Sequence, residues 1–527
     1  MPRFKPFNYS QMTMIPISLE KQIVEGTLEH TIHYLVERKM DTGIFEERFR
    51  NDETGCPAYH PKVLLKVILL GYSHGLVSSR DIEKACRENV IFMALAGEQK
   101  PDHSTIAQFV SSMKREIIHL FRDILMVCEE MELLGGTHFS LDGLRLPSNA
   151  SKEWSGTFKE LRKKKAKLEK RLKEVIREHQ RNDNEREIPS APHKKRVKRL
   201  EQKIRKLEQF LCENEPKAGK TRKEIQSNVT DNESAKMVTS HGVIQGYNAQ
   251  ALVDDKHQII LHGEAFGNAQ DHDNLSPMLQ GTKENLHSLG KPENYFKDKT
   301  FTADGNYYDK KNLQICETEE LDAYIPDPQF RKRDERYAEQ NRFRDGVTRR
   351  PKKQDRDEPP PPQKFTNEDF TYVQSNDSYR CPNDKVLKLR VRRHHIRHVV
   401  YRHYRSQAED CRLCPFRDKC LAKPATKVRH LMIPLYKAGQ KNQDGVLSLT
   451  QKMKNKIDSP EGKAIYSRRL GNIEPVFANI RSQKRMDRFT LRTKVKVDIQ
   501  WMLYCMVHNL EKILHYGDMA KISILRA

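Results

Sequence analysis

Residues 158–212 contain two segments in which a single narrow apolar stripe runs through sequence made mostly of Lys, Arg and Glu. In the second segment the stripe is Val197, Leu200, Ile204, Leu207 and Leu211, spaced 3, 4, 3 and 4 residues apart. A helix with such a stripe needs a partner stripe to pack against. Because the polar segment "QRNDNEREIPSAPH" separates the two stripes, we expect an antiparallel hairpin of two helices.

This hairpin interrupts a region of mixed strands and helices. The segment "HFSLDGLRLP" at 138–147 predicts a strand, and "GVIQGYNAQALVDDKHQIILHGEAF" predicts two antiparallel strands around a polar turn. A helix, a strand, a second helix and a last strand follow, up to residue 327. Without the hairpin, the order strand-strand-strand-helix-strand-helix-strand is that of an RNase H-like fold. The predicted class is therefore α+β.

Residues 15–134 read as helical. Gly75 is a candidate C-cap and Ser78 a candidate N-cap. Residues 101–136 read as one long helix that is capped by Asp102 or Ser104 and ends at two glycines. Arg80, Lys84 and Arg87 could contact DNA from a helix-turn-helix-like arrangement. The alternative is that these residues are ordinary surface charges of a helical bundle.

The pattern divides the chain into five parts. They are a helical DNA-binding domain (1–136), the first part of an RNase H-like core (137–327, with the hairpin 158–212), a charged and Pro-rich linker (328–364), a β-rich insertion containing Cys (365–451), and C-terminal helices that complete the core (452–527). The chain is thus predicted to be an α+β multidomain protein.

Charge and hydropathy restrict the partners. Lys and Arg total 95 against 72 Asp and Glu, a formal net charge of +23, so the chain should attract polyanions, nucleic acid first. The sequence has no apolar run of about 18 residues and no secretory signal at its start, so we expect no membrane partner. We expect a cytoplasmic protein whose ten Cys are reduced.

One carboxylate, Asp142, lies within the apolar strand 138–147. A buried charge is costly unless it is paired or bound to a metal. The RNase H-like order has a further acid after the fourth strand and another on a late helix, which here are Asp304 and Glu474. Three converging carboxylates would suit Mg²⁺ or Mn²⁺, and two such ions can clamp a phosphodiester displacement. The competing acids are Asp231, Asp254, Asp255, Asp271 and Asp273, read as caps or turn residues, and Glu461 as a rival to Glu474.

At these residues the sequence resembles a bacterial insertion-sequence transposase of the DDE type. "LDGLRLPSNASK" and "TADGNYYDKKNLQICE" resemble the family's first and second acid motifs. "YSRRLGNIEPVFANIR" resembles its C-terminal signature, which maps to Tyr466, Arg469, Glu474 and Arg481. The resemblance implies that Tyr466, Arg469 and Arg481 hold phosphates of DNA ends near the metal ions. Asn306 stands where the family usually has Gly.

The resemblance implies a nucleoid-associated enzyme that binds terminal inverted repeats, cleaves double-stranded DNA at the element's ends and joins 3′-OH ends to target DNA. It also implies a homo-oligomer on DNA. One alternative is an RNase H-like nuclease without strand transfer. The other is a non-catalytic, transposase-derived DNA-binding protein.

A second metal question concerns Cys381, Cys411, Cys414 and Cys420. Four thiolates would suit a structural Zn²⁺, although the spacing is not that of a standard zinc ribbon. The alternative is four reduced Cys in a small β-rich unit. The neighbouring "RVRRHHIRHVVYRHYR" is basic, with interleaved Tyr and His. This pattern favours phosphate contacts, with an ordinary basic strand surface as the alternative.

Overall fold

The computed structural model describes most of the chain: residues 17–48, 57–183, 191–219, 223–239, 242–337, 365–367, 369–396, 399–421, 425–437 and 448–518. The chain divides into two compact units. Unit 1 comprises Met1–Asp327 and Pro460–Ala527, and unit 2 comprises Pro328–Ser459. Most of the predicted linker, residues 338–364, lies outside the described residues.

The N-terminal part of unit 1 is helical, as predicted. Its helices are α1 (Leu28–Arg38), α2 (Pro61–Ser73), α3 (Ser79–Glu88), α4 (Val90–Leu95), α5 (His103–Ser112) and α6 (Glu116–Glu130). The predicted caps are confirmed, because Ser78 accepts a hydrogen bond from the Asp81 N–H and Asp102 accepts from the Ser104 N–H. Gly75 follows α2 with a φ of 71°, a conformation that glycine adopts without strain.

The single long helix predicted over 101–136 is wrong, because the structure has a break between α5 and α6. Arg48 donates hydrogen bonds to the Ser112 carbonyl oxygen (2.7 Å) and to the Ser112 hydroxyl (2.8 Å). The same guanidinium donates to Glu116 Oε1 (2.8 Å), in the first turn of α6. A side chain more than 60 residues away thus satisfies polar groups at both sides of the break.

The centre of unit 1 is a six-stranded mixed sheet. Its strands are β1 (His138–Pro147), β4 (Ala235–Thr239), β5 (Gly242–Asp254), β6 (Ile260–Phe266), β7 (Thr300–Ala303) and β8 (Asp322–Tyr324). The order is β4-β5-β1-β7-β8, and β6 pairs with β5. β1 runs antiparallel to β5 and parallel to β7. The predicted hairpin β5–β6 is confirmed, whereas β4 was not predicted.

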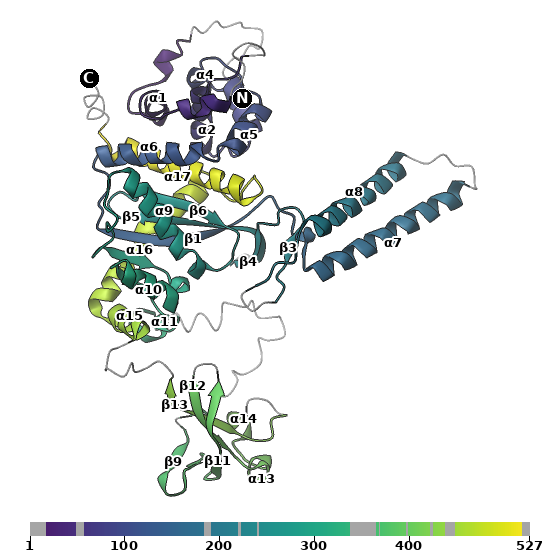
Figure 1. The fold of residues 1–527 in the computed structure, drawn as a ribbon, viewed down its shortest axis with the longest axis vertical. Helices are drawn as coiled ribbons and strands as arrows, with labels where there is room; N and C mark the ends of the chain where they lie inside the picture. The colour runs from purple at the N-terminus through teal and green to yellow at the C-terminus, as the bar shows by residue number, and fades with distance from the viewer. Residues whose placement is uncertain are drawn as a thin grey trace, which may run out of the picture. The chain divides into compact units, whose positions relative to one another are not determined.

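Helices pack against this sheet (Figure 1). They are α9 (Leu275–Ser288), α10 (Lys310–Thr318), α16 (Pro460–Ala478) and α17 (Lys494–Tyr516). α17 contacts β6 and also α6 and α2, so it lies between the sheet and the N-terminal helices. Trp501 on α17 is fully buried and donates a hydrogen bond to the Gln250 carbonyl oxygen at 2.8 Å. Helices that lie more than 300 residues apart in the sequence therefore share one core with the sheet.

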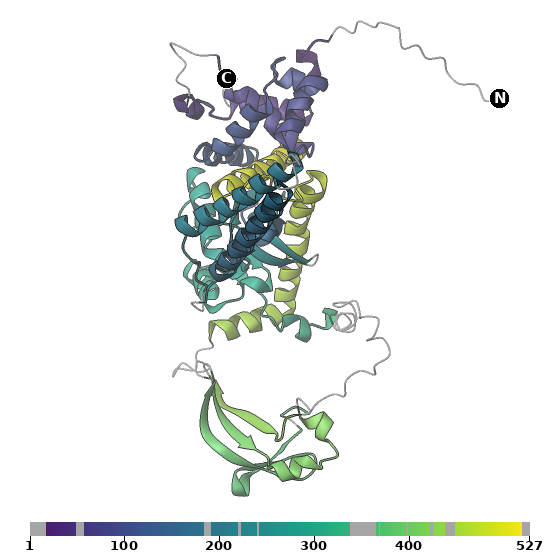
Figure 2. The same ribbon diagram turned by 90° about the vertical axis from the view of Figure 1, so that its right-hand side faces the viewer.

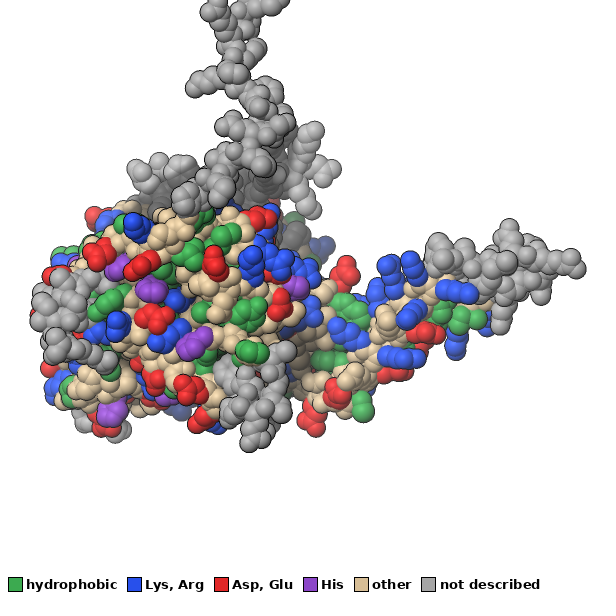
Figure 3. Space-filling model, turned by 90° about the horizontal axis from the view of Figure 1, so that it is seen from above, with side chains coloured by type: hydrophobic (Ala, Val, Ile, Leu, Met, Phe, Trp, Pro, Cys, Tyr) green, Lys and Arg blue, Asp and Glu red, His purple; other side chains and the backbone are tan. Residues whose placement is uncertain are grey.

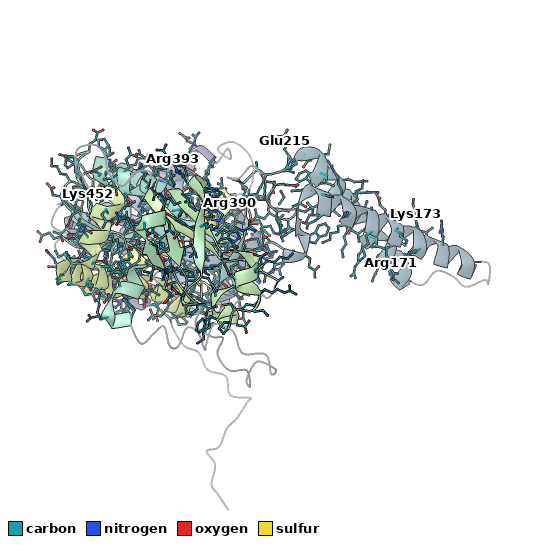
Figure 4. The ribbon with its side chains drawn as sticks, turned by 90° about the horizontal axis from the view of Figure 1, so that it is seen from below. Arg171, Lys173, Glu215, Arg390, Arg393 and Lys452 are labelled. Carbon is teal, nitrogen blue, oxygen red and sulfur yellow. The ribbon has the colours of Figure 1, made fainter. Side chains whose placement is uncertain are left out.

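The predicted helical hairpin is present as α7 (Phe158–Asp183) and α8 (Ala191–Glu213), which pack side by side. Its base is closed by the short strands β2 (Ser155–Gly156) and β3 (Ser227–Asn228). Leu207 of the apolar stripe is buried there, together with Phe158 and Leu161 of α7. Lys and Arg side chains cover much of the hairpin α7–α8 in Figure 3. Figure 4 labels two of them, Arg171 and Lys173.

Unit 2 contains a five-stranded antiparallel sheet (Figure 2). Its strands are β9 (Thr371–Val373), β10 (Ser378–Arg380), β11 (Val386–Ile396), β12 (Val399–Arg405) and β13 (His430–Lys437), in the order β13-β12-β11-β10-β9. The unit also has α11 (Phe330–Arg333), α13 (Ala408–Arg412), α14 (Arg417–Cys420) and α15 (Leu449–Asp458). Its buried core is small: Phe370, Leu387, Tyr404, Cys420, Leu421 and Leu431.

The structure is therefore a mixed α+β fold with several sheets, which confirms the predicted class at that level. None of the described helices is both long enough and apolar enough to cross a membrane.

Candidate functional site

Asp142 and Asp304 occupy neighbouring places on two adjacent parallel strands. Leu141 of β1 pairs with Ala303 of β7, and each acid is the next residue along its own strand direction. Asp304 accepts a hydrogen bond from the Asn306 backbone N–H at 2.9 Å, as the N-cap of a short 3-10 helix. The sheet thus brings together two carboxylates that lie 162 residues apart in the sequence, because 304 − 142 = 162.

Both acids line one pocket of about 480 Å³. Its other walls come from the end of β1, from β4 and β5, and from the segment after α16. The lining residues that carry charge or hydrogen-bonding side chains are Asp142, Arg145, Thr239, Asp271, Asp304, Asn306, Arg481 and Asp487. A pocket lined by both carboxylates and arginines can bind a cation and a phosphate side by side.

Burial, together with a neighbouring carboxylate, disfavours the charge of both acids. Burial raises the pKa of Asp142, although the neighbouring Arg469 opposes this effect. Burial, and then the charge of Asp142, raise the pKa of Asp304 to about 6. An uncompensated pair of like charges would be relieved by a cation bound between them.

Arg469 partly compensates this charge. Its Nη1 lies 2.6 Å from Asp142 Oδ2, and the residue is buried on the face of α16 that packs against the sheet. Its guanidinium carbon lies 5.7 Å from the centre of the Tyr466 ring. Its Nε is buried and has no hydrogen-bond partner among the described residues. A donor of this kind is available to an oxygen of a bound phosphate.

Asp271 is a third carboxylate of the pocket that sequence reasoning did not place there. It is buried and accepts hydrogen bonds from Asn248 Nδ2 (2.6 Å) and Gln250 Nε2 (3.0 Å). It also forms an ion pair with Arg145 Nη2 at 3.0 Å. Because Asp271 precedes a helix, the sequence indicated a helix cap. No local sequence signal distinguishes a capping acid from one that faces a pocket.

Glu474 lies on α16 but not in the pocket. The buried residues of this helix include Arg469, Asn472, Ile473 and Val476, whereas Glu474 is exposed. Asn472 Nδ2 donates to Ser140 Oγ at 3.0 Å, so this neighbour of Glu474 faces β1. Arg481, in a π-helical turn after α16, does line the pocket, and its Nε lies 3.9 Å from Asp487. Of the predicted trio, the structure brings together Asp142 and Asp304.

The donor chemistry of the pocket fits a divalent cation in part. Asp142 and Asp304 supply the carboxylate oxygens that Mg²⁺ and Mn²⁺ prefer. Among the described residues, however, no group of three or more His, Cys, Asp or Glu side chains is arranged to hold a metal ion. The ligand set is therefore incomplete as it stands.

The other predicted DNA-contacting residues, Arg80 and Lys84, lie one turn apart on α3 and are exposed. Lys84 lies 3.7 Å from Glu88 on the same helix. This is a weak, solvent-exposed ion pair, which leaves the lysine accessible to another anion.

The four cysteines of unit 2 all line one small cavity, of about 20 Å³. They are Cys381, Cys411, Cys414 and Cys420, and all four are free thiols. Burial raises the pKa of Cys420, and the other three thiols act in the same direction. Four residues spread over 40 positions are thus brought to one place, although they do not form a metal-holding group as they stand.

Two family models match the chain. A model described as "Transposase DDE domain" matches residues 380–514, and one described as "Transposase domain (DUF772)" matches residues 17–112. The first match contains Tyr466, Arg469, Glu474 and Arg481, and the second contains Arg80 and Lys84. Neither the search of curated proteins nor the search of solved structures gave a match.

Proposed function

We propose that the chain, which two transposase family models match in part, acts as a DDE-type transposase of an insertion sequence. It would bind the element's terminal inverted repeats, cleave phosphodiesters at the element's ends and join the 3′-OH ends to target DNA. The observation that carries this proposal is that Asp142 and Asp304 line one pocket. Arg469 forms an ion pair with Asp142, and the exposed Arg481 lines the same pocket.

The strand order supports an RNase H-like core. Three antiparallel neighbours, β6, β5 and β1, are followed by β7 and β8 in parallel with β1. In an RNase H-like arrangement, an acid on the first core strand lies beside an acid at the end of the fourth core strand. Here these strands would be β1 and β7, and the acids Asp142 and Asp304. Nucleic-acid cleavage is the chemistry for which such a pair of carboxylates is suited.

We propose that Asp142 and Asp304 hold Mg²⁺ or Mn²⁺. When bound, such cations activate the attacking hydroxyl and stabilise the leaving oxygen of a phosphodiester displacement. Arg469 would orient the scissile strand. Its Nη1 holds Asp142, and its buried Nε–H, which has no partner among the described residues, would find a phosphate oxygen as acceptor. Arg481, exposed at the pocket's edge, would contact the neighbouring phosphate.

Glu474 stays the proposed third acid because it stands in the C-terminal signature. Its exposed position outside the pocket means that its participation requires a rearrangement of α16. Binding of a DNA end is the event that would drive such a rearrangement, since the phosphate would compete with Asp142 for Arg469.

DNA binding by the N-terminal helices is a separate part of the proposal. Arg80 and Lys84 share the exposed side of α3, and a short helix with basic residues on one side can lie in or along a groove. Zn²⁺ at the four cysteines of unit 2 is also a proposal. Its support is their shared cavity and the affinity of thiolates for this ion.

The test is cleavage of a DNA fragment that carries the repeats flanking the chromosomal copy, with Mg²⁺ and with EDTA. We expect cleavage with Mg²⁺ only, and transfer of a pre-cut end with a free 3′-OH to plasmid DNA. D142N should abolish both reactions, whereas the exposed-surface variant E293Q on unit 1 should retain both. Cleavage without strand transfer would favour the nuclease, and binding without cleavage would favour a non-catalytic DNA-binding protein.

A further inference from the structure

The three longest strands of unit 2 contain no acidic residue. β11 reads "VLKLRVRRHHI", β12 reads "VVYRHYR" and β13 reads "HLMIPLYK". Together they carry seven Lys and Arg and four His. Figure 4 labels Arg390 and Arg393 on β11. A sheet this rich in cations usually needs either paired acids or a bound anion.

Strand register assigns these residues to two faces. Leu389, Tyr404 and Leu431 pair across β11, β12 and β13 and pack into the core of the unit. Residues next to them point to the opposite face, where Arg405 pairs with Lys388 on one side and with His430 on the other. Lys388, Arg405 and His430 are all exposed. The face opposite the core is therefore open and cationic.

His403 lies at the centre of this open face. Its Nε2 lies 2.8 Å from Nδ1 of His430, and the two rings stack with centroids 5.1 Å apart. The ring of His394 lies 5.9 Å from that of His403 on the other side. Three imidazoles from three adjacent strands thus form a row across the sheet.

Among the described residues, the charged groups with the largest effect on the pKa of His403 are arginines and imidazoles. Burial lowers the pKa of His403, and His430, His394, Arg405 and Arg390 lower it further. Burial also lowers the pKa of His430, together with Arg405. Within the described residues, Lys388, Arg390 and Arg405 form no ion pair, whereas Arg380 and Arg402 pair with Asp384 and Asp377. The open face thus keeps its charge uncompensated.

We propose that this open face binds the phosphate backbone of DNA, and that the pair His403–His430 takes up a proton when the face binds. The face consists of Lys388, Arg390, Arg405 and the row His394–His403–His430. The proposal rests on the DNA-binding function proposed above and names a surface for it. As neutral rings, the two nitrogens at 2.8 Å share one N–H. A phosphate oxygen would accept from both nitrogens once each carries a proton, and its charge offsets the repulsion of the arginines.

The sign of the pH dependence follows. A bound phosphate raises the histidine pKa values above those of the free protein, so binding takes up protons and strengthens as the pH falls. The expected gain in affinity between about pH 7.5 and about pH 5.5 is on the order of tenfold. The variant H403Q/H430Q should bind nearly normally at the higher pH and lose most of this gain.

The experiment is a fluorescence-polarisation titration of the full chain with a labelled random-sequence duplex, at both pH values and at several salt concentrations. The matched control is H287Q, an exposed histidine on α9 in unit 1, which should keep the full gain. A second pair, K388Q/R405Q, should lower the slope of log affinity against log salt by up to about 2, because each lost phosphate contact removes roughly 0.9. Far-ultraviolet circular dichroism checks that each variant is folded.

An equal pH gain in H403Q/H430Q and the wild type would overturn the role of the histidine pair. An unchanged salt slope in K388Q/R405Q would overturn the surface itself. Because the readout is binding, the assay does not depend on whether the chain cuts DNA. A wild type that binds in this way but does not cleave would refute the proposed transposition chemistry and leave the surface intact.

Discussion

Arg469 Nη1 lies 2.6 Å from Asp142 Oδ2, across 327 residues of sequence. The side chains are 7% and 21% exposed, so the pair is largely withdrawn from water. In such a buried pair each charge stabilises the other, since either charge alone would be unfavourable in this environment. The same contact joins α16 to β1, the first strand of the sheet.

The pair predicts strong coupling between the two residues. R469Q should lower the free energy of unfolding by about 3 kcal/mol, because it leaves the Asp142 carboxylate buried without its cation. D142N/R469Q should be less destabilised than the sum of the two single variants. Urea unfolding of the four proteins of this cycle measures the coupling. Additive effects would show that the ion pair contributes nothing to the fold.

Burial of Asp304, together with the charge of Asp142, predicts a pH-dependent stability of the metal-free protein. The pKa of Asp304 is raised from 3.8 to about 6. The folded state therefore holds the proton more tightly than the unfolded state, so this group's contribution to stability falls as the pH rises from about 4 to about 6. D304N should remove this dependence. Thermal unfolding in EDTA at pH values across this window measures it.

The wild type and D304N also test the cation. Added Mg²⁺ should raise the melting temperature of the wild type above pH 6, where Asp304 is ionised, and should not raise that of D304N. A shift of equal size in D304N would place the ion elsewhere.

Substitution of Asp271 should lower stability, whereas substitution of Glu474 should lower cleavage activity. D271N should destabilise the protein, because the Asp271 carboxylate accepts from Asn248 and Gln250 and pairs with Arg145. E474Q should leave the melting temperature nearly unchanged, because Glu474 is exposed, but should abolish Mg²⁺-dependent cleavage. Normal cleavage by E474Q would remove Glu474 from the proposed site.

His508 predicts acid sensitivity of unit 1. Burial lowers its pKa from 6.5 to about 3, and its Nε2 lies 2.9 Å from the Gln258 carbonyl oxygen. The unfolded state therefore binds a proton that the folded state excludes, so stability is lost as the pH falls from 6.5 towards 3. Between about pH 6.5 and about pH 5 the loss should be about 2 kcal/mol. H508Q should show a shallower loss in urea unfolding at these two pH values.

The four cysteines predict about one zinc ion per chain after purification without chelator. The ion should be lost in C411S/C414S and retained in C212S, which changes an exposed cysteine of the hairpin. It should also be retained in D142N, which separates this site from the acidic pocket. Elemental analysis gives the content. Structural zinc sites of this kind bind the ion with roughly nanomolar or tighter affinity, so a zinc-supplemented wild type should be nearly saturated. A zinc content below about a tenth of an equivalent per chain would contradict the prediction.

The local pattern was sufficient for many elements. Ser78 and Asp102 cap the helices that they were predicted to cap, since a cap depends on a side chain and an N–H two or three residues away. The stripes of 158–212 predicted α7 and α8 because the period of the apolar residues is itself the signal of a helix pair. The break near Ser112 was missed because its partner, Arg48, lies far away in the sequence.

For the candidate site, the sequence by itself determined which strand carries Asp142 and which strand ends before Asp304, because alternation, caps and turns are written in neighbouring residues. Only the tertiary structure decided that Asp271 lines the same pocket, that Arg469 pairs with Asp142, and that Glu474 faces outwards. These facts depend on which face of a helix meets the sheet. That choice is made by packing and burial over the whole unit, and no short stretch of sequence contains it.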